Sequence, residues 1–135
     1  MKRICLCGSM SVLLRMLEIK STLESNGMAV ETPSLDEPKD YSVLSEVERA
    51  PIKTEMILRH LERIKKSEAI LVVNETAKGV ENYIGANSFL EMGIAFALEK
   101  PIFLLNSVPQ QLNRDELLGL NPTELKGDLD SLYKF

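Results

Sequence analysis

The sequence predicts an α/β fold in which helices cover both faces of a five-stranded parallel sheet. Short apolar segments alternate with longer segments of helical periodicity along the chain, and this alternation is typical of parallel strands joined by right-handed crossovers. The apolar segments lack a polar face, which indicates strands buried on both sides. Five strands favour a flavodoxin-like, Rossmann-like three-layer sandwich with the strand order 2-1-3-4-5.

The first half of the predicted sheet comes from two short segments on either side of a helix. Residues 3–7 form a strand that ends at a Gly-Ser pair. Residues 10–26 carry apolar side chains near helical spacing and end at an Asn-Gly pair, a common helix stop. Residues 28–32 form a second strand, which Pro33 ends.

The middle of the chain contains the clearest strand. Residues 33–46 hold two prolines and four acidic residues without a clear period, so we expect a loop there and regard it as a candidate lid. A charged helix with an apolar stripe follows at 48–66. Residues 69–74, Ala-Ile-Leu-Val-Val-Asn, are uncharged and rich in β-branched side chains, as a buried strand requires.

The last third completes the alternation. Residues 87–99 are apolar on almost every side and predict a heavily buried helix. A strand at 101–106, a helix at 110–118 and a weak strand at 125–126 follow, and Asp128 is positioned to cap a short C-terminal helix.

Composition excludes several classes of function. A chain of 135 residues without a linker predicts one domain over residues 1–135. The net charge of −4 and the pI near 5.1 argue against a nucleic-acid partner, which needs a basic surface. No apolar run approaches the ~20 residues of a membrane span. Two cysteines that are two residues apart cannot stabilise a fold through a disulfide. This cysteine usage indicates a reducing, cytoplasmic location.

The predicted topology locates a ligand site. In such sheets ligands bind beyond the carboxyl ends of the strands where the order reverses, here between the first and third strands. Gly8, Ser9 and Met10 follow the first strand, and Asn74 ends the third. The Gly-Ser turn can offer backbone N–H groups to an anion or a sugar hydroxyl, although a tight turn explains the glycine equally well. The twelve-residue loop 75–86 exceeds the usual ~2–6 residues, which favours a binding loop over a plain surface excursion.

Glu91 is the strongest candidate for chemistry. It shares an apolar helical stripe with Ile94, and Asn87 lies one turn before it on the same face. A carboxylate on the inward face of a buried helix requires a partner or a function. A capping box with Ser88 as N-cap explains Glu91 equally well. Both roles are compatible, because a helix N-terminus also favours an ionised acid.

The remaining candidates are one histidine and two cysteines. His60 lies at the edge of the apolar stripe of its helix, where a structural role is the plainer explanation. Cys5 and Cys7 point to the same face of the first strand and are too close for a sound disulfide. A metal site needs two further ligands, so we expect buried core thiols and no metal. Phosphate-binding and dinucleotide-binding glycine motifs are missing from the sequence, which argues against such cofactors.

Four segments together resemble the nucleoside 2-deoxyribosyltransferase superfamily, which includes 2′-deoxynucleoside 5′-monophosphate N-glycosidases. The resemblance runs from residue 1 to about residue 107, and its most specific part is Glu91-Met-Gly at a helix start followed by a Lys-Pro strand. The four segments are Cys-Leu-Cys-Gly-Ser-Met (5–10), Ser-Glu-Ala-Ile-Leu-Val-Val-Asn (67–74), Asn-Tyr-Ile-Gly-Ala-Asn-Ser-Phe-Leu-Glu-Met-Gly-Ile-Ala-Phe-Ala (82–97) and Lys-Pro-Ile-Phe-Leu-Leu (100–105).

The resemblance implies cleavage or transfer of the N-glycosidic bond of a (deoxy)nucleoside or its 5′-monophosphate. The glutamate matching Glu91 would attack the anomeric carbon, and water or a second base would resolve the covalent glycosyl-enzyme. The loop before it, with Asn82, Gly85 and Asn87, would hold the sugar, and the Gly-Ser turn would hold the sugar or its 5′ substituent. Enzymes of this kind are commonly oligomers with shared sites, which implies a homodimer or a higher homo-oligomer.

The chain departs from the resemblance at three positions. His60 stands where well-studied members carry an aspartate, and a histidine can still donate a proton near neutral pH. Gly85 and Asn87 stand where transferases and phosphate-handling hydrolases carry an acid or a serine. A second hypothesis therefore stays open: a non-catalytic nucleotide-binding or sensing domain in which Glu91 caps its helix or binds ribose hydroxyls.

Overall fold

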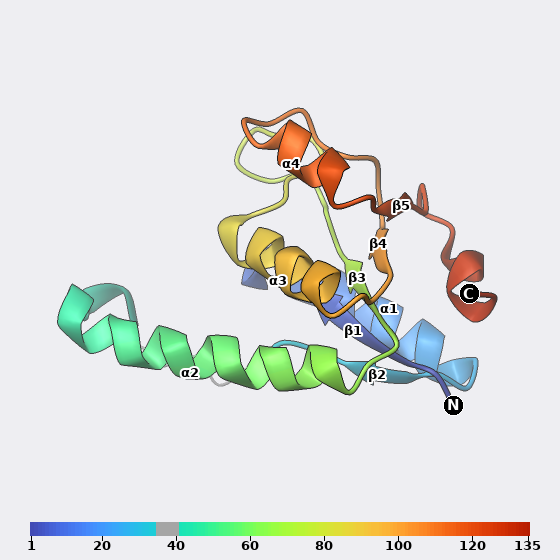
Figure 1. The fold of residues 1–135 in the computed structure, drawn as a ribbon, viewed down its shortest axis with the longest axis horizontal. Coiled ribbons are helices and arrows are strands. Elements are labelled where there is room, and N and C mark those ends of the chain that lie inside the picture. Colours follow the sequence, from blue (N-terminus) through green and yellow to red (C-terminus); the bar gives the residue numbers. More distant parts are fainter. Residues whose placement is uncertain (35–40) are drawn as a thin grey trace.

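A computed structural model of the chain describes residues 1–34 and 41–135. Its five strands form one parallel sheet in the order β2-β1-β3-β4-β5 (Figure 1), which confirms the predicted fold class and strand order. The strands are β1 (Arg3–Cys7), β2 (Ala29–Glu31), β3 (Ala69–Val72), β4 (Ile102–Leu104) and β5 (Thr123–Glu124).

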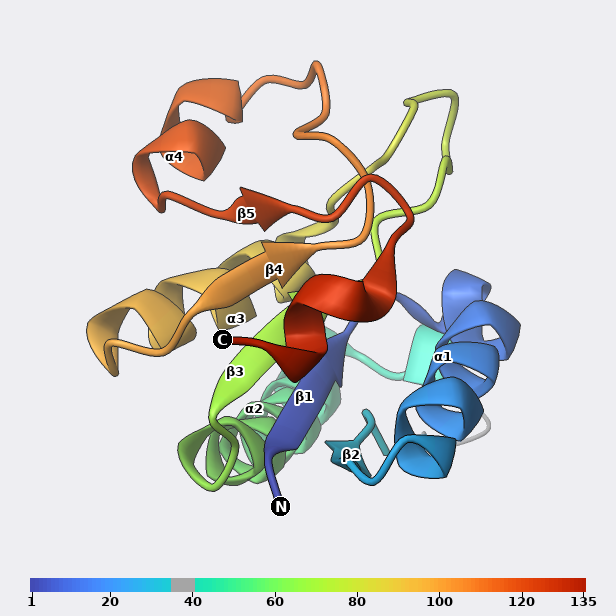
Figure 2. The same cartoon turned by 90° about the vertical axis from the view of Figure 1, so that its right-hand side faces the viewer.

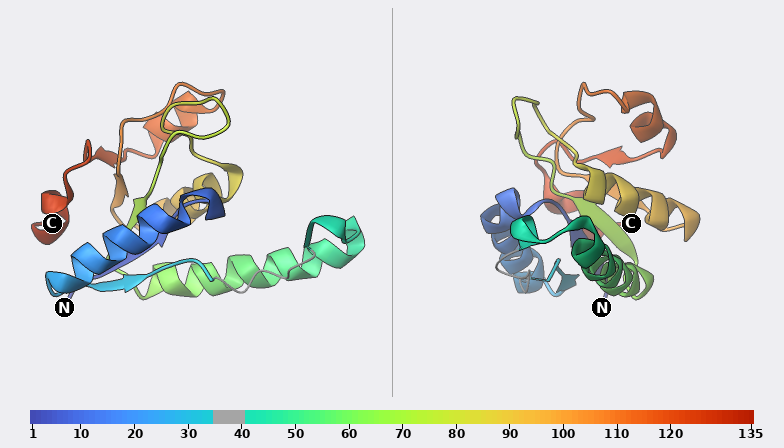
Figure 3. Two further views of the ribbon diagram at one scale, coloured as in Figure 1. Left: turned by 180° about the vertical axis from the view of Figure 1, so that it is seen from behind. Right: turned by 90° about the vertical axis from the view of Figure 1, so that its left-hand side faces the viewer.

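Helices cover both faces of this sheet, as Figure 2 shows. Helix α1 and the C-terminal 3-10 helix η3 pack on one face, and α2 and α3 pack on the other. The N-terminal half of the long helix α2 extends past the sheet (Figure 3, left). The helices are η1 (Met10–Val12), α1 (Leu13–Ser25), η2 (Tyr41–Val43), α2 (Glu46–Lys65), α3 (Ala86–Ala97), α4 (Arg114–Gly119) and η3 (Leu129–Tyr133).

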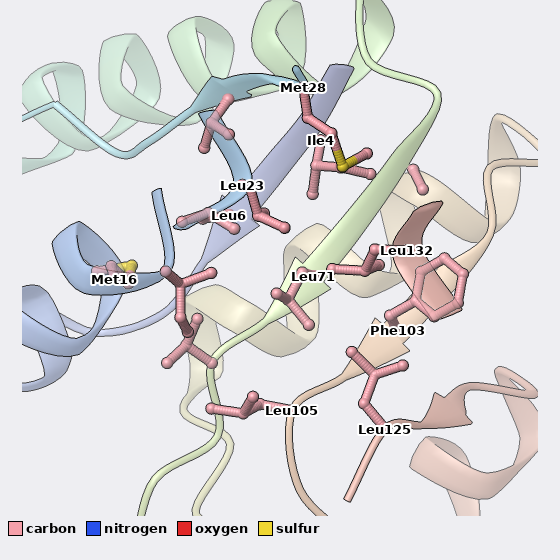
Figure 4. Close-up of a cluster of buried hydrophobic side chains, with 14 residues drawn as sticks. Ile4, Leu6, Met16, Leu23, Met28, Leu71, Phe103, Leu105, Leu125 and Leu132 are labelled. Atoms are coloured by element: carbon pink, nitrogen blue, oxygen red, sulfur yellow. The ribbon is translucent and has the colours of Figure 1, made fainter. Parts of the chain in front are cut away.

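Strand β1 divides its side chains between two cores. Ile4 and Leu6 point towards α1, where they join the cluster drawn in Figure 4. Cys5 and Cys7 point the opposite way, into the cluster that β1 shares with α2 and α3. This alternation follows from the two-residue period of a strand. It places both thiols under the helices that carry His60 and Glu91.

Helix α2 begins two residues earlier than the sequence pattern predicted. The Ser45 side chain accepts a hydrogen bond from the Glu48 backbone N–H, and the Glu48 carboxylate accepts one from the Ser45 backbone N–H, so the two form a capping box. Of the expected loop at 33–46, residues 35–40 lie outside the described residues. The candidate lid is therefore not described, and only the single turn η2 is seen after it.

Element ends differ from the predicted ones most strongly after β4. The helix expected at 110–118 begins only at Arg114, because the Gln111 side chain pairs with the backbone N–H and C=O of Ile84. The last strand lies at 123–124 instead of 125–126. Asp128 is an N-cap as predicted, and it accepts a bond from the Asp130 N–H at 2.9 Å, although the helix that follows is 3-10.

Candidate functional site

A cavity of about 330 Å³ lies beyond the carboxyl ends of β1 and β2, under α2 and α3. The turn after β1 forms one part of its wall, and Pro33 and Ser34 after β2 form another. The rest of the wall comes from α2 and α3. The cavity lies at the predicted edge of the sheet, but beyond β1 and β2 instead of between β1 and β3, and the segment 73–86 that follows β3 does not line it. Six residues predicted from the sequence line it together: Gly8, Ser9, Met10, His60, Asn87 and Glu91.

Three further predicted residues do not line this cavity. The buried Asn74 amide donates to the backbone carbonyls of Asn106 and Ser107 and accepts from the Asn106 N–H. Asn82 has a φ of +59° within the loop 75–85, and Gly85 is the N-cap of α3. The structure therefore places Asn74, Asn82 and Gly85 in backbone-shaping positions outside the cavity wall.

Glu91 lies in the second turn of α3, with 17% of its side chain exposed. Ser88 lies inside this helix, whose N-cap is Gly85, so the alternative explanation of Glu91 as part of a capping box with Ser88 is wrong. The Glu91 Oε2 atom is 3.4 Å from His60 Nε2, and the Cys7 thiol lies close enough to the same carboxylate to act against the rise of its pKa. The carboxylate is therefore mostly buried, lies next to side chains from two other elements and is exposed at one edge to the cavity.

His60 connects the two helices to β1. Its ring is buried, and Nε2 lies 3.5 Å from both Cys5 Sγ and Cys7 Sγ. The other ring nitrogen, Nδ1, is 3.2 Å from Arg63 Nη1. A guanidinium only donates, so Nδ1 must accept, and neutral His60 carries its proton on Nε2. That proton points towards Glu91 and the two sulfur atoms.

The four buried groups perturb one another electrostatically. Burial raises the pKa of Glu91 to about 7, although the nearby His60 charge and the Cys7 hydrogen bond act in the opposite direction. A hydrogen bond from Cys7 lowers the pKa of Cys5 to about 6, and that same bond, with burial, raises the pKa of Cys7. Burial alone would lower the pKa of His60, but Cys5 and the Glu91 charge outweigh it and raise this pKa.

Sequence reasoning missed the cationic part of the wall. Lys53, Arg59 and Arg63 all line the cavity from α2. Lys53 and Arg63 lie seven residues before and three residues after His60, which is helical spacing for one face. If His60 is taken as a site residue, this spacing predicts that Lys53 and Arg63 line the same site. The contact of His60 with both cysteines had no such signal, since nothing local indicates which helix covers which face of β1.

Comparison with known proteins supports the fold. No family model matches this sequence, and a search of curated proteins gives no match. Among solved structures, the chain is similar to a 2-deoxyribosyltransferase from the psychrotolerant bacterium Bacillus psychrosaccharolyticus, described as a biocatalyst for nucleoside synthesis. The likeness covers 98% of this chain and 91% of that chain at 18% identity, with a TM-score of 0.61. The chain therefore has the fold of a 2-deoxyribosyltransferase, and the resemblance seen in the sequence is confirmed at the level of fold.

Proposed function

We propose that this protein is an enzyme that cleaves or transfers the N-glycosidic bond of a (deoxy)nucleoside or its 5′-monophosphate, with Glu91 as the nucleophile. One observation carries the proposal: a mostly buried carboxylate, next to His60 and Cys7, forms part of the wall of a cavity at the carboxyl edge of the sheet. The likeness to a 2-deoxyribosyltransferase supports the same chemistry.

The proposed reaction has two displacements. A Glu91 oxygen forms a bond to C1′ of the sugar as the C1′–N bond breaks, and the released base takes the electron pair and gains a proton from solvent. Water, or the nitrogen of a second base, then attacks C1′, returns a proton to solvent and frees the carboxylate. Hydrolysis and transfer differ only in this second acceptor.

His60 acts as a positioning residue in this proposal. Its Nε2 atom lies 3.4 Å from Glu91 Oε2, and the Arg63 bond to Nδ1 keeps the ring in the tautomer whose Nε2–H faces that carboxylate. His60 is the position at which the chain departs from the family it resembles, whose well-studied members carry an aspartate there. A histidine there supports the nucleophile from the side, and we do not assign it the proton that the leaving base requires.

The cavity wall suits a substrate of mixed polarity. A volume of about 330 Å³ lies within the range of small-molecule sites, roughly 300–1,000 Å³. Ile57, Leu90 and Ile94 offer apolar surface on which a nucleobase can pack. Lys53 and Arg59 add positive charge, which favours an anionic group such as a 5′-phosphate.

Assembly and location stay predictions. We expect at least a homodimer, and Val47 and Leu58 on α2 present exposed apolar side chains suited to a partner. Light scattering after size exclusion would measure the oligomeric state. Within the described residues, the helices are either too short or too polar to cross a bilayer, and we expect the protein in the cytoplasm.

The experiment that tests the proposal measures free base by chromatography after incubation with deoxynucleosides and with their 5′-monophosphates. We expect base release, and we expect Glu91→Gln to lower it on the order of 10³-fold or more, because an amide is no nucleophile at this position. The matched control is Glu62→Gln on the exposed side of α2, which should release base as the wild type does. Addition of a second free base would convert hydrolysis into exchange if the enzyme is a transferase.

Two results would contradict catalysis by Glu91. One is release of base by Glu91→Gln at the wild-type rate. The other is calorimetric binding of nucleotides without base release from any of them, which would favour the non-catalytic binding domain.

A further inference from the structure

A cluster of three soft donor atoms lies beside the cavity, formed by Cys5, Cys7 and His60. The two Sγ atoms and one ring nitrogen all lie within 4.8 Å of one another, and all three residues are buried. Both cysteines are free thiols. The proposed glycosyl transfer uses the hydrogen bonds of His60 and Cys7 but gives Cys5 no role.

The spacing of these donors agrees with tetrahedral zinc. Zn–S bonds of about 2.3 Å and a Zn–N bond of about 2.0 Å at tetrahedral angles place sulfur and nitrogen about 3.5 Å apart. His60 Nε2 is 3.5 Å from Cys5 Sγ and 3.5 Å from Cys7 Sγ. The ring nitrogen has one proton or one lone pair, so it cannot make a full hydrogen bond to both sulfurs and to Glu91 at once. A metal ion would satisfy both sulfurs and the nitrogen together.

The donors come from rigid elements. Cys5 and Cys7 are alternate residues of β1, a strand whose neighbours on both sides are paired to it. His60 projects from α2 onto the same face of the sheet. The sequence alone suggested no metal because it offered two thiols without further ligands; packing of α2 on β1 supplies the third. Two thiolates and an imidazole select zinc over magnesium or calcium.

We propose that Cys5, Cys7 and His60 bind a zinc ion through Sγ, Sγ and Nε2, with the fourth coordination position facing Glu91. Three protein donors and one further position are typical of zinc sites that hold water or a substrate atom. The Glu91 carboxylate, 3.4 Å from Nε2, would contact whatever occupies that position.

Zinc binding is separate from the proposed glycosyl transfer, but a bound zinc ion would change that reaction. A zinc-bound Nε2 and a zinc-bound Cys7 thiolate have no proton to offer the carboxylate, so Glu91 loses both neighbours that orient it. Zinc should therefore lower base release, and a chelator should restore it.

Arg63 gives the proposal an internal test. Coordination through Nε2 moves the ring proton to Nδ1, which now faces the Arg63 guanidinium at 3.2 Å. The guanidinium must move away, and its charge also repels the metal. Arg63→Gln removes the charge and provides an amide oxygen that can accept the Nδ1 proton. We expect this substitution to tighten zinc binding on the order of tenfold, the scale of effects from groups that contact a metal ligand.

The experiment titrates the full-length protein, reduced and freed of metal with a chelator, with Co²⁺ and then Zn²⁺. We expect one Co²⁺ per chain, with thiolate-to-cobalt charge-transfer absorption and the intense visible bands of a tetrahedral ion, and we expect Zn²⁺ to abolish both. Cys5→Ser and Cys7→Ser should each weaken the charge-transfer band, with circular dichroism verifying the fold. Ser9→Ala, on the cavity wall but outside the cluster, is the matched control and should bind as the wild type does.

The result that would overturn the proposal is a Co²⁺ spectrum of the wild-type protein without a thiolate band, or a band that both serine variants retain in full. Weaker metal binding by Arg63→Gln would contradict coordination through Nε2. Glu91→Gln should keep the thiolate band while losing base release. Failure of the metal site and failure of the glycosyl-transfer proposal are therefore distinguishable.

Discussion

Glu91 shows how a single residue can be costly to the fold and useful to the site. Its carboxylate is mostly buried, and burial raises its pKa to about 7. Two side chains lie next to this carboxylate, Cys7 from β1 and His60 from α2. A buried acid without a capping role, aimed at a cavity, is the arrangement that functional sites commonly maintain at the expense of stability.

The raised pKa predicts the direction of a pH effect on stability in metal-free protein. Glu91 ionises near 4.5 when unfolded and near 7 when folded, so its contribution is fully present below pH 4.5 and is lost as the pH rises to about 7. Glu91→Gln has no ionisable side chain at this position, so its free energy of unfolding does not fall for this reason as the pH rises. Urea unfolding should show the variant gaining on the wild type between pH 5 and 8, by on the order of 2–3 kcal/mol. A stability difference that does not change over this pH range would show that burial does not raise the pKa.

Helix α2 is the element that unites the site. One face of it contributes Lys53, Ile57, His60 and Arg63 to the cavity, while its N-terminal half extends beyond the sheet (Figure 1). A helix that projects in this way has few tertiary contacts at its start. Local capping therefore contributes a larger share of its stability there than it does for a helix packed along its full length.

The capping box predicts the cost of one substitution at that end. Ser45→Ala removes the side-chain acceptor for the Glu48 N–H and should lower the free energy of unfolding by about 1 kcal/mol in urea denaturation. Ser42→Ala, in the exposed turn before the helix, is the matched control and should change stability little. Equal stability of the two variants would indicate that this end of α2 frays in solution. Base release should persist in Ser45→Ala, because the cap lies far along the helix from His60.

Across the whole molecule, paired asparagines tie the carboxyl ends of β3 and β4 together. Asn74 and Asn106 exchange hydrogen bonds between side chain and backbone in both directions, and Asn74 also donates to the Ser107 carbonyl. These bonds satisfy buried polar atoms where two adjacent strands give way to loops. They join the residue that precedes the loop 75–85 to the segment after β4, and neither that loop nor that segment lines the cavity.

This pairing predicts non-additive stability. Asn74→Ala should lower the free energy of unfolding by roughly 2–4 kcal/mol, since it leaves buried backbone groups without partners. Asn106→Ala should also destabilise the protein, and the double variant should cost less than the two single changes added together. Additive effects in a thermal or urea double-mutant cycle would show that the two residues do not act as a pair.

The sequence by itself determined the order of the elements, the strand order of the sheet and the edge where Gly8, Ser9 and Met10 meet Glu91. These features follow from short-range patterns, namely the two-residue period of strands, the 3.6-residue period of helices and the right-handed crossover. Element ends were less well determined. Gln111 delays α4 through a contact with Ile84, and the start of α3 at Ala86 removes the capping role of Ser88.

Only the tertiary structure decided which side chains meet. The period of the strand predicts that Cys5 and Cys7 share one face of β1, and the period of the helix predicts that His60 and Lys53 share one face of α2. Neither period predicts that these two faces are in contact. That contact depends on how α2 packs across β1, which joins residues more than fifty positions apart. The same packing places Glu91 next to His60 and Cys7. Local periodicity carries no information about such distant pairings, so the donor cluster beside the cavity emerged only from the folded chain.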